Sequence, residues 1–186
     1  MDALAAAEAA FAAAAALHER MRGRLGPAVA AAQAIRDALA RGGKVLAFGN
    51  GGSAADAQHF AAELVGRFTK ERAALAAIAL TTDTSVLTSV ANDYSFAQVF
   101  VRQIDALGAA GDVAVAISTS GASANVQLAV ERARERGLTT IALTGRDGGS
   151  VGRAAAIHVN VPDGNTARVQ EVHRTLLHVM CELIER

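Results

Sequence analysis

The stretch GNGGSAADAQHFAAEL, at residues 49–64, gathers several groups that can do chemistry. It opens with Gly49, Asn50, Gly51, Gly52 and Ser53 and then enters a helical pattern. Glycines allow a backbone to approach a ligand closely, and the free N–H groups of a helix start favour an anion. Ser53 can also cap the helix. The stretch is therefore a candidate anion-binding loop, a candidate metal site, or only a tight turn that caps a helix.

His59 and Glu63 follow within the same stretch. Their spacing of four residues puts them on one face of a helix. An imidazole and a carboxylate on one face can chelate a divalent ion, although such a pair is more often simply solvated. A metal site would therefore need further ligands from elsewhere in the chain.

Gln170 and His178 lie on a predicted helix over residues 166–185. His178 stands in an apolar stretch, where a histidine is usually a core residue, whereas His18, His158 and His173 are expected at the surface or at a strand edge. Gln170 and His178 are roughly 12 Å apart along the axis at about 1.5 Å per residue. One metal with bonds of about 2 Å can hardly take both. If both serve one site, at least one comes from a neighbouring subunit.

A second loop, STSGAS at residues 118–123, carries four hydroxyl groups at another predicted helix start. Its candidate ligand-binding residues are Ser118, Thr119, Ser120 and Ser123. Neither loop is a Walker motif, because no Lys-Ser or Lys-Thr follows the glycines, and GNGGSA lacks the third glycine of G-x-G-x-x-G. Two such loops predict a site for a phosphate ester, and they favour a phosphosugar over a nucleotide.

Asn92 and Asp93 form a third candidate. They can cap a helix predicted over residues 95–107, or they can hydrogen-bond the hydroxyls of a sugar. The residues alone leave both roles open.

The elements that must position these loops follow from the hydrophobic pattern. Short apolar runs are separated by mostly helical segments, which indicates a parallel sheet covered on both faces. The expected strands are residues 44–49, 75–80, 112–118, 139–145 and 155–161. The predicted fold class is an α/β three-layer sandwich with a five-stranded parallel sheet. Ligands of such sheets bind beyond the carboxyl ends of the strands, where both loops lie.

Two helices are predicted before the sheet, over residues 2–22 and 27–41. We expect a single domain over 1–186, with a helical hairpin over 1–41 and the α/β sandwich over 42–186. Alanine-rich helices placed before a small sheet have little to cover within it. The hairpin is therefore expected to pack against another copy of the chain, or to be only a surface pair.

Composition excludes several classes of function. The 18 basic and 18 acidic residues balance, so nothing favours nucleic acid or an anionic membrane as a partner. A single cysteine, Cys181, fits a reducing cytoplasm. The alanine-rich start lacks a basic n-region, and no uncharged run reaches the roughly 20 residues of a membrane span. A cytoplasmic protein that does not enter the membrane is expected.

Four blocks in order resemble the phosphoheptose isomerases, which are sugar isomerase (SIS) domain proteins. The blocks are GNGGSAADAQHFAAELVGRF, ANDYSFAQVFVRQ, AISTSGASANV and ARVQEVHRTLLHVMCELIE. The resemblance implies a flavodoxin-like or Rossmann-like sheet, a tetramer and one zinc ion per subunit. It implies an aldose–ketose isomerase that converts sedoheptulose 7-phosphate into D-glycero-D-manno-heptose 7-phosphate, the first step of ADP- or GDP-heptose biosynthesis.

By the same resemblance, the metal ligands correspond to His59, Glu63, Gln170 and His178. Glu63 and His178 correspond to the proton-transfer pair. The substrate would be held by Asn50, Gly51, Gly52, Ser53, Asn92, Asp93, Ser118, Thr119, Ser120, Ser123 and Gln170.

The chain departs from the family pattern at two positions. Ala122 stands where the family usually has Asn, and Ala167 where some members have an acidic residue.

Two other functions are possible within the same family of folds. One alternative is a non-catalytic relative that binds the replication initiator, in which the closing-helix histidine is replaced and the serine loop altered. The other is a module that senses a phosphosugar without converting it. The presence of His178 and the intact Ser118–Ser120 run favours the enzyme.

Overall fold

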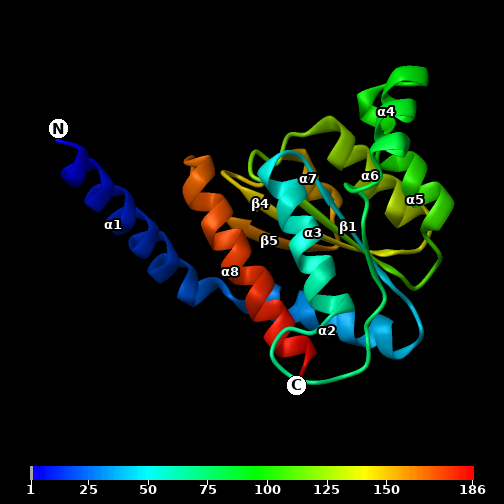
Figure 1. The fold of residues 1–186 in the computed structure, drawn as a ribbon, viewed down its shortest axis with the longest axis horizontal. Helices are drawn as coiled ribbons and strands as arrows, with labels where there is room; N and C mark the ends of the chain where they lie inside the picture. Colours follow the sequence, from blue (N-terminus) through cyan, green and yellow to red (C-terminus); the bar gives the residue numbers. More distant parts are fainter. Residues whose placement is uncertain (1) are drawn as a thin grey trace.

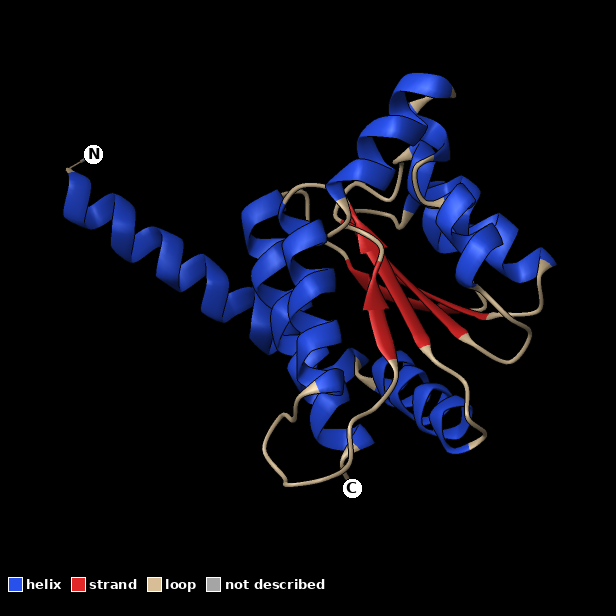
Figure 2. Cartoon of the chain, turned by 45° about the vertical axis from the view of Figure 1, so that its right-hand side comes forward, coloured by secondary structure: helices blue, strands red, loops and turns tan. Residues whose placement is uncertain are grey.

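The computed structural model describes residues 2–186 as an α/β sandwich (Figures 1 and 2). All five predicted strands are present: β1 (Val45–Gly49), β2 (Ala77–Ala79), β3 (Val113–Ser118), β4 (Thr139–Gly145) and β5 (Ile157–Val161). They form one parallel sheet in the order β2-β1-β3-β4-β5. The predicted fold class is confirmed.

Alternate strand residues feed two cores, one on each face of the sheet. In β1, Val45 and Ala47 belong to the first core, whereas Leu46 and Phe48 belong to the second. This alternation is the period of two that any strand imposes on its side chains. Figure 2 shows helices on both faces of the sheet.

One face is covered by α2 (Gly26–Ala40), α3 (Gly52–Val65) and α8 (Thr166–Ile184). The other is covered mainly by α5 (Val101–Leu107), α6 (Ala124–Glu135) and α7 (Gly149–Ala154). Both α3 and α8 follow a strand and return across the sheet, so they run parallel to each other. That arrangement brings the site-bearing faces of two distant segments together (Figure 1).

The two helices before the sheet differ from the expectation. The second, α2, is a core helix, because Ala28, Ala31 and Ile35 are fully buried in the first core. Its alanines let it pack closely over β5 and α8. The first, α1 (Ala3–Met21), buries only Leu17 and Met21 and extends away from the body (Figure 1). Of these two helices, only α1 therefore leaves most of its surface exposed.

The segment between β2 and β3 was predicted least well. Residues 84–93 form a helix, α4 (Thr84–Asp93), although their Thr and Ser residues have modest helix propensity. Asp83 begins it by accepting a hydrogen bond from the Val86 N–H at 2.9 Å. The helix predicted over 95–107 is split into a short 3-10 turn (Phe96–Gln98) and α5. Among the helices of residues 2–186, none is long and apolar enough to cross a membrane.

Candidate active site

The loops after β1 and β3 lie side by side because those strands are neighbours in the sheet. Gly49, the last residue of β1, is in register with Ile117 of β3. From β1 the chain continues to β2 on one side of β1, and then crosses to β3 on the other side. The strand order therefore reverses between β1 and β3, and the two loops flank this point. Such a point is where open α/β sheets bind their ligands.

A cavity of about 300 Å³ opens between the two loops. Every residue predicted to hold the substrate lines it except Asn92 and Asp93. The lining comprises Asn50, Gly51, Gly52, Ser53, Ile117, Ser118, Thr119, Ser120, Ser123, Thr166 and Gln170.

The hydroxyl groups of the second loop cluster within this cavity. The Ser118 Oγ atom lies 3.1 Å from the Ser123 Oγ atom and 3.5 Å from the Ser120 Oγ atom. Ser120 also accepts a hydrogen bond from the Ala122 N–H at 3.2 Å. Ser123 is the N-cap of α6, so the cluster sits at the positive end of a helix dipole. Hydroxyl donors at a helix start suit an anionic oxygen such as that of a phosphate.

The first loop depends on its glycines. Gly51 has a φ of 58°, which L residues rarely adopt. At Gly52 a β-carbon would overlap the Nε2 atom of Gln170. The side chain of Gln170 thus lies directly on the backbone of the first loop.

Asn125 joins the two loops, and sequence reasoning did not single it out. Its side chain is 4% exposed and exchanges two hydrogen bonds with Asn50, each 2.9 Å long. A buried amide that satisfies another amide in both directions fixes the relative position of the two segments. Its only sequence signal was its place two residues after the serine cluster.

His59 and His178 meet at the other end of the α3–α8 interface. Their Nε2 atoms are 2.8 Å apart, and the His59 Nε2 atom is 3.4 Å from the Glu63 Oε1 atom. Both rings are half-buried. His178 is therefore not the core histidine of α8. That residue is His173, expected at the surface but fully buried, where desolvation lowers its pKa and its Nε2 atom donates to the Thr144 carbonyl.

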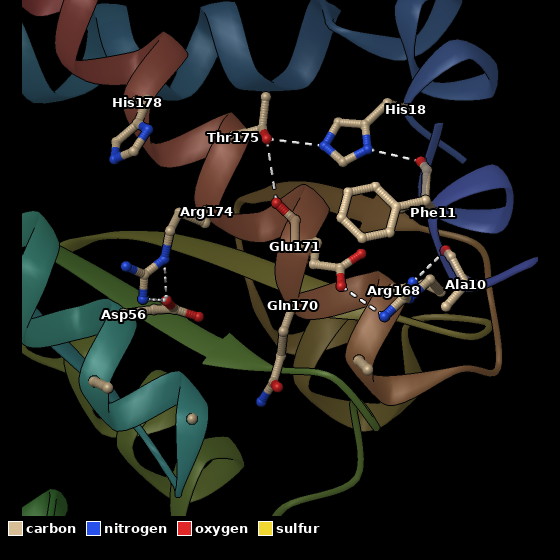
Figure 3. Close-up of a pocket in the computed structure, with 14 residues that line it drawn as sticks. Ala10, Phe11, His18, Asp56, Arg168, Gln170, Glu171, Arg174, Thr175 and His178 are labelled. Carbon is tan, nitrogen blue, oxygen red and sulfur yellow. Dashed lines mark hydrogen bonds and ion pairs between the residues drawn. The ribbon is translucent and has the colours of Figure 1, made fainter. Parts of the chain in front are cut away.

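The side chains of His59, Glu63 and His178 offer the kinds of donor atom that zinc binds, imidazole nitrogen and carboxylate oxygen. Within residues 2–186, however, no group of three or more His, Cys, Asp or Glu side chains is already arranged to hold a metal. Gln170 lies against Gly52, and its side chain points away from His178 (Figure 3). One chain thus brings together His59, Glu63 and His178 but leaves Gln170 apart, as the spacing along α8 requires.

Asn92 and Asp93 are also separate from this region. They are the last residues of α4, both exposed, and Asn92 donates a hydrogen bond to Asp93 at 2.8 Å. Among the described residues, neither lines the two cavities beside α3 and α8. They do not cap the following helical turn either, because its N-cap is Ser95.

A larger cavity of about 800 Å³ lies between α1, α3 and α8 (Figure 3). Gly52 and Gln170 line both cavities, so the two spaces adjoin. Arg174 lies midway along the interface and donates to the Asp56 carboxylate from its Nη2 atom at 2.5 Å. His178 lines the far end. The cavities thus connect the hydroxyl cluster with His178 along the α3–α8 interface.

Cys181 lies one turn beyond His178 and is buried. Burial, together with the nearby carboxylates of Glu63 and Glu185, raises the pKa of its thiol to about 12. The thiol is therefore protonated at neutral pH and is a poor nucleophile.

Comparisons with known proteins agree with this geometry. The family model of the SIS domain matches residues 10–145. A phosphoheptose isomerase from Citrifermentans bemidjiense is 57% identical over 89% of this chain and 87% of its own length. The structure of phosphoheptose isomerase from Neisseria gonorrhoeae has a TM-score of 0.93 and 50% identity, covering 99% of both chains.

A phosphoheptose isomerase structure from Francisella tularensis also has a TM-score of 0.93, at 39% identity, covering 99% of this chain and 98% of that one. Both structures match the whole of the α/β fold, and the relatives span the loops and both site-bearing helices. The chain therefore belongs to the SIS domain family and, within it, to the phosphoheptose isomerases.

Proposed function

We propose that this chain isomerises sedoheptulose 7-phosphate to D-glycero-D-manno-heptose 7-phosphate, the first step of ADP- or GDP-heptose biosynthesis. The observation that carries the proposal is the convergence of both glycine- and hydroxyl-rich loops on one cavity at the reversal point of the sheet. That cavity offers donors for a phosphate group. The adjoining space leads to His178, one member of the proposed acid–base pair.

Ketose-to-aldose conversion moves a proton from C1 to C2 through an enediol. We assign Glu63 to the carbons: it removes the C1 proton and returns a proton to C2. We assign His178 to the oxygens: it gives a proton to the C2 oxygen and takes one from the C1 hydroxyl. The position of Glu63 beside the His59–His178 pair supports the choice of Glu63 and His178 as the residues that transfer these protons.

Zinc is the proposed cofactor, one ion per subunit, with His59, Glu63, Gln170 and His178 as its ligands. When bound, zinc supplies a Lewis acid that polarises a carbonyl group. Because a carboxylate bound to a metal is a weakened base, Glu63 would serve the two roles at different stages. Metal analysis of protein purified without added zinc tests the assignment, and a metal-free, fully active enzyme would refute it.

The proposed assembly is a homotetramer with active sites at subunit interfaces. The positions of Gln170 and of Asn92 and Asp93 support it, because one chain leaves all three away from the histidine pair. The exposed apolar side chains of α1, Leu4 and Phe11, supply a surface for such contacts. The lone, buried Cys181 agrees with a cytoplasmic location.

The test is a direct assay of the aldose product with sedoheptulose 7-phosphate, comparing the wild type with Glu63→Gln. Glutamine keeps the shape of the side chain but cannot take a proton from carbon. We expect turnover to fall by roughly 10²-fold or more, the usual contribution of a general base. A Glu63→Gln enzyme with wild-type turnover would refute the role of Glu63. A phosphosugar sensor would bind sedoheptulose 7-phosphate without forming aldose. A relative that binds the replication initiator would form no aldose either.

A further inference from the structure

The proposed proton-transfer pair lies near the C-terminal ends of α3 and α8. The loop over residues 66–72 follows α3 and contacts the end of α8. Glu63 lies in the last turns of α3. His178 lies two turns before Glu185, the residue that ends α8. Residues seven positions apart share one face of a helix, so Glu185 lies on the His178 side of α8.

Glu185 binds the backbone of this loop. Its carboxylate accepts hydrogen bonds from the N–H groups of Phe68, Thr69 and Lys70, at 2.9 to 3.0 Å. Its side chain is 2% exposed. Burial by itself would raise the pKa of Glu185, but these N–H groups outweigh burial and lower it to about 2. The carboxylate is thus charged at every physiological pH.

Arg72 connects the same carboxylate to α3. Its Nε atom lies 3.2 Å from the Glu185 carboxylate. Its Nη2 atom donates to the carbonyl of Glu63 at 2.7 Å, and its Nη1 atom donates to the carbonyl of Leu64 at 2.9 Å. The last carbonyls of a helix have no partner within the helix, and Arg72 supplies one. One guanidinium therefore holds the backbone of Glu63 and the end of α8 together.

The loop also contacts the other member of the pair. The ring of Phe68 lies 5.3 Å from the ring of His178, centroid to centroid, and His178 in turn lies 5.0 Å from His59. Glu185 holds the Phe68 backbone, so it also fixes one wall against which the His178 ring packs.

We propose that Arg72 and Glu185 are positioning residues that set the distance between Glu63 and His178. We call this pair the α3–α8 clamp. The inference rests on the proposed function. Among residues 2–186, those that line the substrate cavity between the loops include neither member of the clamp. Loss of the clamp should therefore slow the chemical step and leave binding of the phosphate intact.

The experiment compares Glu185→Gln with a matched control, Asp112→Asn. Asp112 is also a buried carboxylate, which accepts hydrogen bonds from the N–H groups of Lys44 and Ala109 and pairs with the Lys44 Nζ atom at 2.6 Å. It precedes β3, at the edge of the sheet opposite the loops. Both substitutions keep the side-chain shape and remove one buried charge.

We expect both variants to lower the melting temperature. Only Glu185→Gln should lower kcat, by roughly 10- to 100-fold, because a shift of about 1 Å in a reacting group has that effect. Its KM for sedoheptulose 7-phosphate should stay within about 2-fold of wild type, as for a loss confined to the transition state. An unchanged kcat, or an equal loss in Asp112→Asn, would overturn the proposal.

Arg72→Lys provides a second test if Glu185→Gln does not fold. Lysine keeps a charge beside Glu185 but cannot bridge to the α3 carbonyls as a guanidinium does. A folded Arg72→Lys enzyme with wild-type kcat would also overturn the proposal. A wild-type protein that forms no aldose would instead refute the proposed function.

Discussion

Gln170 lies against the backbone of Gly52, so its side chain can hold this position only because residue 52 has no β-carbon. The contact involves the end of a flexible side chain, so a larger residue at position 52 would move Gln170 without disrupting the fold. Gln170 lines both cavities of the candidate site. Its displacement should therefore change substrate binding.

We expect Gly52→Ala to raise KM for sedoheptulose 7-phosphate by roughly 10-fold, which corresponds to about one lost hydrogen bond. Stability should change little, since alanine favours the helix. Gly26→Ala is the matched control, because Gly26 also begins a helix and a β-carbon added there would have no atom within 4 Å. Steady-state kinetics of both variants check this, and equal KM values would contradict the role of Gln170.

The sequence predicted the residues that line the site better than the residues that hold them in position. The loop residues were recognisable because two loops rich in glycine and hydroxyl groups follow strands of one predicted sheet, at the edge where such sheets bind ligands. Asn125, Arg72 and Glu185 were not, because their partners lie far away in the chain. His173 and His178 were exchanged in prediction, since His178 has the more apolar neighbours in the sequence and only the packed helix shows that His173 faces the sheet.

The loop over residues 66–72, which binds the end of α8 through Glu185, contributes to the acid sensitivity of the fold. The pKa of Glu185 is lowered from 4.5 to about 2 by the N–H groups of the 66–72 loop, which outweigh burial. A lowered carboxyl pKa stabilises the folded state fully above the unfolded value and loses that effect as the pH falls toward the folded value. Docking of the loop should therefore weaken between about pH 4.5 and 2.

Thermal unfolding of wild type and Glu185→Gln across this range measures the effect. The wild type should be more stable at pH 7, and the difference should shrink steadily below about pH 4.5. Asp112 and Asp163 also have lowered pKa values, but both proteins keep them, so their contributions cancel. A difference that stays constant down to pH 3 would show that the carboxylate of Glu185 does not anchor the loop.

Element prediction succeeded where the pattern was strong. Each strand is a run of apolar residues bounded by glycine or polar residues, and all five were found. Helix α4 was missed because the Thr and Ser residues of 84–93 have modest helix propensity, although Val86, Leu87 and Val90 recur on one helix face. Its start depends on one cap, Asp83. The core role of α2 was also missed, because an alanine-rich face gives little sign of burial.

On the scale of the whole molecule, α1 packs on the body through Leu17 and Met21 near its C-terminal end but presents large apolar side chains to solvent nearer its start. Leu4 is 66% exposed and Phe11 is 81% exposed, although α1 borders the larger cavity. Leu4 and Phe11 are seven positions apart and so share one face of α1, and apolar surface gathered on one exposed face marks an interaction site. The proposed tetramer would bury them.

We expect Phe11→Ser to shift the assembly toward smaller species in size-exclusion chromatography with light scattering. Leu128→Ser is the control, because Leu128 is an exposed apolar residue of α6, on the opposite face of the sheet. That variant should keep the wild-type mass. A monomeric wild type, or an unchanged mass for Phe11→Ser, would contradict an interface through α1.

The most direct measurement is the reaction of the wild-type enzyme with sedoheptulose 7-phosphate in D₂O, followed by NMR of the product. Transfer through the carboxylate of Glu63 exposes the migrating proton to exchange with solvent, so the aldose should carry deuterium at C2. In Glu63→Gln both the product and the label should be lost. Aldose formed by Glu63→Gln at the wild-type rate and with the wild-type content of deuterium at C2 would contradict the role of Glu63 in the enediol mechanism proposed for this site.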